Sequence, residues 1–168
     1  NNTNNATDWA LGTHSVFNDF SRFYHVMVKV DTTESVATDR VNLWIDGVKQ
    51  AGAPYLETEI YPSSQNYTNW FGSSGKSNRL GARDGSGNPY TPMDGYLADV
   101  VYVDGQALST SAFGVFNASG QWVPQNGDLS FATGNSFRLL FEKETDNTSS
   151  IGNDVLGLSN SFTAYNLN

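Results

Sequence analysis

The chain of 168 residues contains no cysteine, two histidines, and charged residues at only 15% of its positions. The absence of cysteine excludes disulfide bonds and thiolate metal sites. His14 and His25 are too few and too dispersed for a zinc site. A Ser/His/Asp triad is also disfavoured, because no glycine-flanked nucleophile turn accompanies them. We interpret His25 as a core or inter-sheet histidine with one hydrogen-bond partner.

Positive charge and long apolar runs are also scarce. Nine lysines and arginines stand against 17 acidic residues, which gives a formal net charge of −8. The basic stripe of a nucleic-acid-binding protein is therefore missing. No apolar run approaches the roughly 20 residues that cross a membrane. The polar segment 1–8 has no signal-peptide pattern, and we expect it to be disordered or a linker. We expect neither nucleic acid nor a membrane as a partner.

Helical periodicity is nearly absent, and alternation of apolar and polar residues takes its place. The run 23–30 alternates and predicts a strand. The run 41–50 predicts a hairpin, because apolar residues flank Asp46-Gly47, a pair that accepts positive φ angles. The run 95–103 is apolar on both faces, which is typical of a central strand in a two-layer fold.

Shorter segments complete an all-β pattern. A brief helical turn is expected at 109–113, with Ser109 as its cap. Many short strands separated by turn residues predict an antiparallel β-sandwich or jelly roll. We expect this sandwich at 9–144, followed by a polar connector and last strand at 145–168. The shorter strand candidates are 69–72, 79–82, 121–123, 136–141 and 162–165.

Three segments carry a resemblance to a known family, namely Val16–Gln50, Asp94–Gln125 and Ser149–Asn168. They are similar to the concanavalin A-like and laminin-G-like modules in structural proteins of tailed phages, especially marine phages and cyanophages. The block DGYLADVVYVDGQAL is the most specific part of the match. The loop Tyr61–Asn66 also follows the family pattern.

The resemblance implies a non-enzymatic virion protein with a lectin-like fold, on a tail fibre or on the capsid exterior. It implies host attachment through surface glycans, with other virion proteins and further copies of the chain, trimers included, as partners. Family members carry more strands upstream of Trp9, so the sandwich is either a fragment or completed by another chain. Two alternatives remain, a secreted bacterial carbohydrate-binding or adhesion module and a glycan depolymerase.

Sugar binding calls for exposed aromatic rings beside amide and carboxylate groups. We expect Trp44 and Trp122 in the core, since a sandwich uses many aromatic residues internally. The same reasoning offers packing as the alternative role for each aromatic residue in the loops. The candidate sugar-binding residues are Tyr61, Tyr67, Trp70, Asn88 and Tyr90.

The acidic residues offer candidate ligands for calcium, but they do not form the pattern of a catalytic site. The candidate calcium ligands are Asp84, Asn88 and Asp94, and the alternative is a plain Gly-rich turn before Pro89. No cofactor is required by this interpretation. The pairs Glu57/Glu59 and Glu142/Glu144 have alternate spacing but no third acidic partner, and we interpret them as solvated. Asp99 alternates with apolar neighbours and is expected to be structural.

Overall fold

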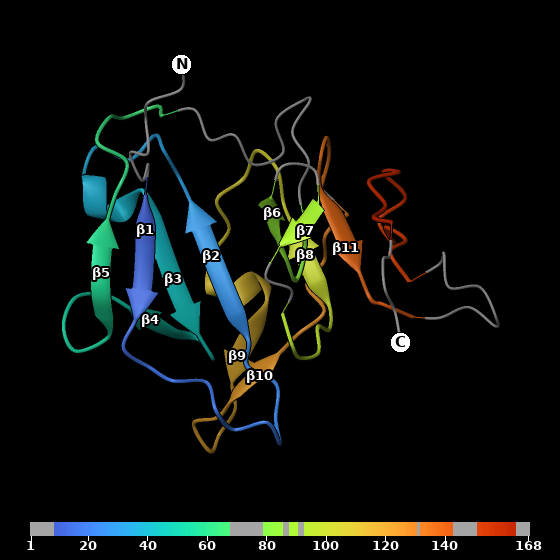
Figure 1. Ribbon diagram of the computed structural model, residues 1–168, viewed down its shortest axis with the longest axis horizontal. Coiled ribbons are helices and arrows are strands. Elements are labelled where there is room, and N and C mark those ends of the chain that lie inside the picture. The colour runs from blue at the N-terminus through green and yellow to red at the C-terminus, as the bar shows by residue number, and fades with distance from the viewer. Residues whose placement is uncertain are drawn as a thin grey trace. The chain divides into compact units, whose positions relative to one another are not determined.

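The computed structural model describes residues 9–67, 79–85, 88–90, 93–130, 132–142 and 151–163, and this part of the chain is almost entirely β (Figure 1). Its only helices are the two short 3-10 turns η1 (Ala37–Asp39) and η2 (Thr110–Ala112). All of its strand pairs are antiparallel. The predicted all-β class is confirmed. Among these residues, no helix has the length and apolar character needed to cross a membrane.

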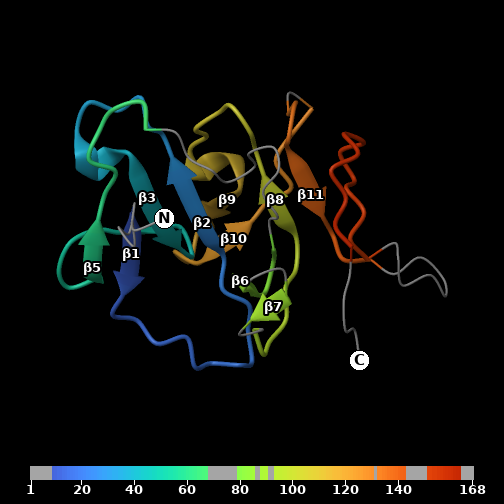
Figure 2. The same cartoon turned by 45° about the horizontal axis from the view of Figure 1, so that its top comes forward.

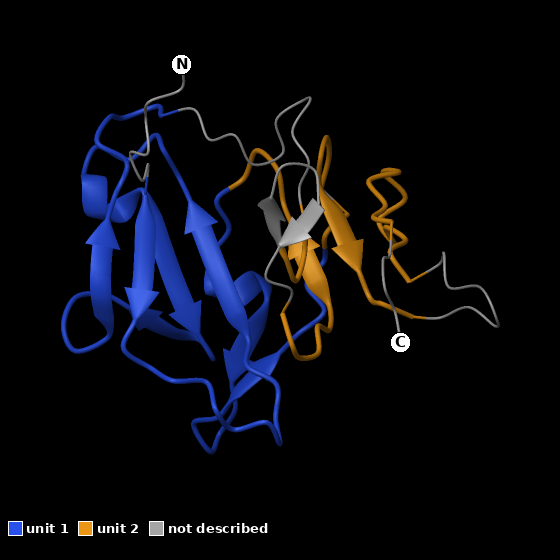
Figure 3. Cartoon of the chain, in the orientation of Figure 1, with its two compact units in different colours: residues 1–68, 107–128 blue, residues 69–106, 129–168 orange. Residues whose placement is uncertain are grey.

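The chain forms two compact units (Figure 3). Unit 1 comprises residues 1–68 and 107–128, and unit 2 comprises residues 69–106 and 129–168. Each unit therefore combines segments that are distant in the sequence.

Unit 1 contains three small antiparallel sheets. Strands β2 (Val26–Val30), β3 (Val41–Ile45) and β4 (Val48–Gln50) form one sheet in that order. The other two are the pair β1 (Ala10–Thr13) and β5 (Leu56–Ile60), and the hairpin β9 (Gly114–Phe116) and β10 (Trp122–Pro124).

The predicted hairpin at 41–50 is confirmed. Asp46 and Gly47 both have positive φ angles, 47° and 74°, as a two-residue turn between twisted strands requires. The register pairs Ile45 with Val48 and Leu43 with Gln50. The alternation of apolar residues and the two turn residues were together enough to predict this hairpin.

The core of unit 1 lies on β2, β3 and β5. Met27, Val41, Leu43 and Leu56 are buried there, and Val41 is only 1% exposed. In β5 the alternation leaves Leu56 inside while Glu57 and Glu59 face solvent together.

Unit 2 contains the pair β8 (Val100–Tyr102) and β11 (Phe137–Leu139) and the hairpin β6 (Arg83–Gly85) and β7 (Asn88–Tyr90). Phe137 packs between the rings of Tyr102 and Phe162, with centroid distances of 5.5 and 4.9 Å. Leu139 is fully buried.

A closed loop, residues 152–162, lies beside β11. The Phe162 amide donates to the Gly152 carbonyl at 2.7 Å and closes it. Inside the loop, the Asp154 carboxylate accepts backbone N–H groups from Leu156 and Leu158 at 3.0 Å and from Asn160 at 3.4 Å. It also accepts the Arg138 amide of β11 at 3.0 Å. The Asp154 carboxylate thus organises the loop and helps to join it to β11, together with the bond from the Val155 amide to the Arg138 carbonyl at 2.9 Å.

Several strand predictions were too long. β2 begins at Val26 instead of residue 23, and only 100–102 of the predicted strand 95–103 is β. Asp99 interrupts that strand because its φ is +49°, a left-handed conformation that a strand cannot contain. It has a structural role, because its carboxylate forms a two-point ion pair with Arg138 at 2.7 and 2.8 Å.

The remaining differences concern short segments. The turn predicted at 109–113 is present, but Ser109 makes no capping bond, because its hydroxyl pairs with Ser111. Residues 79–82 form no strand, and a strand follows at 83–85 instead. The candidate at 121–123 corresponds to β10, one residue further along the chain. The candidate at 136–141 was too long, because β11 occupies only its central residues 137–139. Residues 162 and 163 of the strand predicted at 162–165 form no strand. Segments 1–8, 69–72 and 164–165 lie outside the described residues.

Candidate functional site

Two loops of unit 1 come together at one end of its strands. We call residues 31–40 and 61–67 the loop pair. The first loop joins β2 to β3 and the second follows β5, and Figures 1 and 2 both show them at the same end of these strands. The Asn66 amide donates to the Thr32 carbonyl at 2.7 Å. The Gln65 side-chain amide donates to the Thr33 carbonyl at 2.5 Å. The loops are therefore joined by direct hydrogen bonds.

The buried side chain of Arg40 joins the two loops of the loop pair. Arg40 is only 5% exposed. Its guanidinium donates to the carbonyls of Glu34 and Ser35 in its own loop at 2.8 and 2.9 Å. It donates to the Pro62 carbonyl of the other loop at 2.7 Å. Since a buried guanidinium is stable only when its donors are satisfied, these three bonds hold both backbones in one arrangement.

The surface of the loop pair is polar and carries two tyrosines. Tyr61 and Tyr67 are half-buried. Asn66 has a φ of 58°, a left-handed conformation that asparagine tolerates better than most residues. The exposed amide and hydroxyl side chains are those of Thr33, Ser35, Thr38, Ser63, Ser64, Gln65 and Asn66. Fixed polar groups beside aromatic rings are suited to hydroxyl-rich ligands.

Three carboxylates, those of Asp31, Asp39 and Glu59, shape the electrostatics of the loop pair. The Tyr61 hydroxyl donates to Glu59 at 2.9 Å. Burial, this hydrogen bond, and the charges of Glu59 and Asp39 raise the pKa of Tyr61 to about 12. Hydrogen bonds from Thr33 and the charge of Lys29 lower the pKa of Asp31. Tyr61 is therefore a neutral phenol and Asp31 an anion throughout the physiological pH range.

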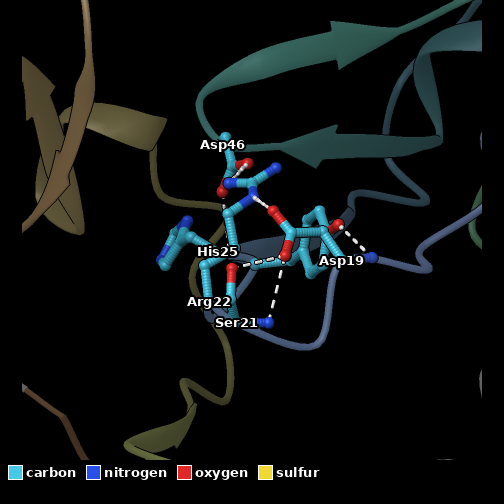
Figure 4. Close-up of polar contacts among 6 residues, drawn as sticks. Asp19, Ser21, Arg22, His25 and Asp46 are labelled. Atoms are coloured by element: carbon cyan, nitrogen blue, oxygen red, sulfur yellow. Dashed lines mark hydrogen bonds and ion pairs between the residues drawn. The ribbon is translucent and has the colours of Figure 1, made fainter.

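A second polar group of residues lies before β2, at its other end. The Asp46 carboxylate accepts the Arg22 guanidinium and the His25 amide, both at 2.8 Å. Arg22 also lies over the Tyr24 ring at 3.9 Å. The Ser21 hydroxyl donates to Asp19, and Figure 4 shows the His25 ring directed away from that pair. The geometry is that of a structural brace between the 14–24 segment and the β3–β4 turn.

The His25 ring packs against Trp122, with centroids 5.7 Å apart. Phe116 meets the same indole edge-on at 5.1 Å. A Cβ on Gly47 or on Gly114 would lie 2.2 Å from the indole, so both positions need glycine. Trp122 therefore has a packing role, but Trp122 and Trp44 are both half-buried instead of lying fully in the core. His25 lies, as interpreted, in a packed environment.

The predicted sugar-binding residues are only partly described. Tyr61 and Tyr67 lie in the loop pair. Trp70 lies outside the described residues, and for Asn88 and Tyr90 only the backbone in β7 is described. The loop pair thus gathers two of the five predicted residues.

The predicted calcium ligands are described even less completely. Only the backbone of Asp84 and Asn88 is described, on β6 and β7, while Asp94 is exposed. Among the described residues, no three acidic or histidine side chains cluster closely enough for a metal ion. The calcium site stays a prediction.

Sequence reasoning missed Arg40 and the loop of Asp31 to Ser35. A single arginine beside a short polar segment does not indicate, from the sequence alone, that its side chain is buried and joins two loops. Its role is visible only once the Pro62 carbonyl is found beside its guanidinium. Comparison with family models, with curated proteins and with solved structures gave no match.

Proposed function

We propose that the chain is a non-catalytic, lectin-like jelly-roll module of a phage virion, which contacts host-surface glycan through the loop pair. The loop pair is the observation that carries the proposal. Two loops distant in sequence are held by buried Arg40 and offer exposed amides and hydroxyls beside two half-buried tyrosines. A surface fixed in advance loses little conformational entropy when a sugar binds.

The virion origin rests on the resemblance in the block Asp94–Leu108 and in the segments around it. That resemblance supports a position on a tail fibre or capsid exterior, contacts with other virion proteins, and a homo-oligomer. Fold alone would not support these points, because lectin-like sandwiches serve many functions.

The arrangement of Glu57 and Glu59 supports a binding role over catalysis. Both carboxylates lie on the same face of β5, and both are exposed. A glycosidase acid is usually kept protonated by apolar surroundings, which these positions lack. Glu59 is also occupied by the Tyr61 hydroxyl. A depolymerase would release reducing sugar from host polysaccharide and lose that activity in Glu57→Gln, and we expect no release.

The binding proposal is tested on a glycan array with the full chain and two matched variants. Asn66→Gly removes an exposed amide of the loop pair while keeping the left-handed backbone accessible. Asn18→Gly makes the same change in the exposed segment before β2, at the other end of that strand. We expect binding to fall at least about tenfold in Asn66→Gly, which is about 1.4 kcal/mol, and to be unchanged in Asn18→Gly. Equal binding by all three proteins would contradict the assignment to the loop pair.

A secreted bacterial module would use the same residues. The two origins differ in gene context. Capsid, portal and tail genes beside this gene would support the virion proposal, and polysaccharide-degradation genes would contradict it.

A further inference from the structure

The loop pair has an unequal balance of charge. Within 29–40 and 59–67, four carboxylates stand against two cations, Lys29 and Arg40. The carboxylates belong to Asp31, Glu34, Asp39 and Glu59. Asp39 and Glu59 are exposed, and Asp31 and Glu34 are half-buried, so their charges act at the surface where a ligand would lie.

Arg40 is badly placed to bind an anion. Its Nε, Nη1 and Nη2 atoms donate to backbone carbonyls, and its side chain is buried. Recognition of a sugar carboxylate or sulfate normally uses an accessible guanidinium that makes two parallel bonds. Lys29 lies close enough to Asp31 to lower the pKa of that carboxyl, so its charge is already partly balanced.

The acceptor groups, in contrast, are accessible. Carboxylates accept hydrogen bonds only, and sugar hydroxyls are their natural donors. Burial is the main cause of the raised pKa of Tyr61, and the hydrogen bond to Glu59 and the charges of Glu59 and Asp39 raise it further. A second negative charge brought by a ligand would meet the same repulsion.

We infer that the loop pair selects neutral, hydroxyl-rich glycans and rejects glycans that carry uronate, sialate or sulfate groups. This inference rests on the proposed function of the loop pair. It adds the substrate class, which follows from the accessible carboxylates and from the buried guanidinium, whose three nitrogens each donate to a backbone carbonyl.

The test uses an array on which each glycan core is present both neutral and capped with sialic acid, uronic acid or sulfate. The full chain is measured at low and at physiological ionic strength. We expect neutral cores to bind at least about tenfold more tightly than their acidic counterparts at low salt. The gap should narrow as salt shortens the range of the repulsion.

Charge variants identify the cause. The double variant Asp39→Asn, Glu59→Gln should bind acidic glycans more tightly than the parent chain and so reduce the gap. Asp19→Asn is the control, since it removes one charge before β2, at the other end of that strand from the loop pair.

The outcomes separate the two claims. Equal or tighter binding to acidic glycans would overturn the inference and leave glycan binding intact. The preference for neutral cores could also stay the same at high salt and in the double variant. That result would contradict the electrostatic explanation of the preference. Absence of binding to every glycan would overturn the proposed function and this inference with it.

Discussion

At the scale of single residues, a few side chains determine the conformation around them. Glu59 holds the Tyr61 hydroxyl, and Trp122 fills the space that two glycines leave open. Each of these contacts predicts the effect of one substitution.

The first residue-scale prediction concerns Tyr61 at alkaline pH. Its pKa is raised from 10.0 to about 12, chiefly by burial and then by the hydrogen bond to Glu59. The folded chain therefore keeps this proton where the unfolded chain loses it, so the contribution is full below about pH 10 and disappears as pH rises towards 12. Chemical denaturation across this range should show a smaller loss of stability in Tyr61→Phe than in the parent chain. Burial also raises the pKa of Tyr102. Because Tyr102 is present in both proteins, its contribution does not affect the comparison. Identical pH profiles would contradict the assignment.

The second concerns Gly114, whose Cβ would lie 2.2 Å from the Trp122 ring. Gly114→Ala should lower the free energy of unfolding by about 1–3 kcal/mol, because overpacking forces the indole to move. Gly95→Ala is the control, since its Cβ would meet only the end of Met93 at 3.9 Å. In a double-mutant cycle, Trp122→Leu should remove most of the penalty of Gly114→Ala. Additive effects of the two changes would show that the indole is not the cause.

At the scale of elements, the hairpin β3–β4 was predictable and the loops were not. Local signals were enough for the hairpin, because alternation and the Asp46-Gly47 turn act within ten residues. The loop pair depends on bonds between residues 22 or more positions apart, such as Arg40 to Pro62. The strand at 95–103 was predicted too long because nothing local reveals that Asp99 leaves the strand to pair with Arg138.

Arg40 provides the first element-scale prediction. Arg40→Met should cost about 3 kcal/mol, because it leaves three backbone carbonyls without their charged donor. Amide exchange at Asn66, whose N–H donates to Thr32, should accelerate as the second loop loosens. Arg22→Met is the control, and it should cost much less stability because the Arg22 side chain is 49% exposed. Similar losses in the two variants would contradict the anchoring role.

Asp154 provides the second element-scale prediction. Asp154→Ala removes the acceptor of four backbone amides and should release the loop 152–162 from β11. We expect a loss of about 2–4 kcal/mol in urea unfolding and faster proteolysis within the loop. Asn153→Ala changes the exposed neighbouring residue and should leave both measurements unchanged. An intact, protected loop in Asp154→Ala would show that the remaining contacts hold it without the carboxylate. These contacts are the Val155 amide bonded to the Arg138 carbonyl, the Asn160 side chain bonded to the carbonyls of Gly134 and Ser136, and the Phe162 ring against Phe137.

At the scale of the whole molecule, the sequence predicted the all-β class because patterning and turn residues act everywhere in the chain. The chain forms two compact units, each built from two separate segments. The bounds 9–144 for one sandwich stay a prediction. The way these segments combine into units depends on contacts between distant parts of the chain. The periodicity of apolar residues in the sequence does not reveal such contacts. The candidate site was found in part, since Tyr61 and Tyr67 were named and Arg40 was not.

The central claim is that glycan binds at the loop pair, and amide chemical-shift mapping tests it most directly. A neutral glycan that binds on the array is titrated into isotope-labelled chain, and the shifted amides are assigned. We predict that the largest shifts occur at 31–35 and 61–67 and that they disappear in Asn66→Gly. Shifts confined to other segments, with the loop pair unaffected, would contradict the account.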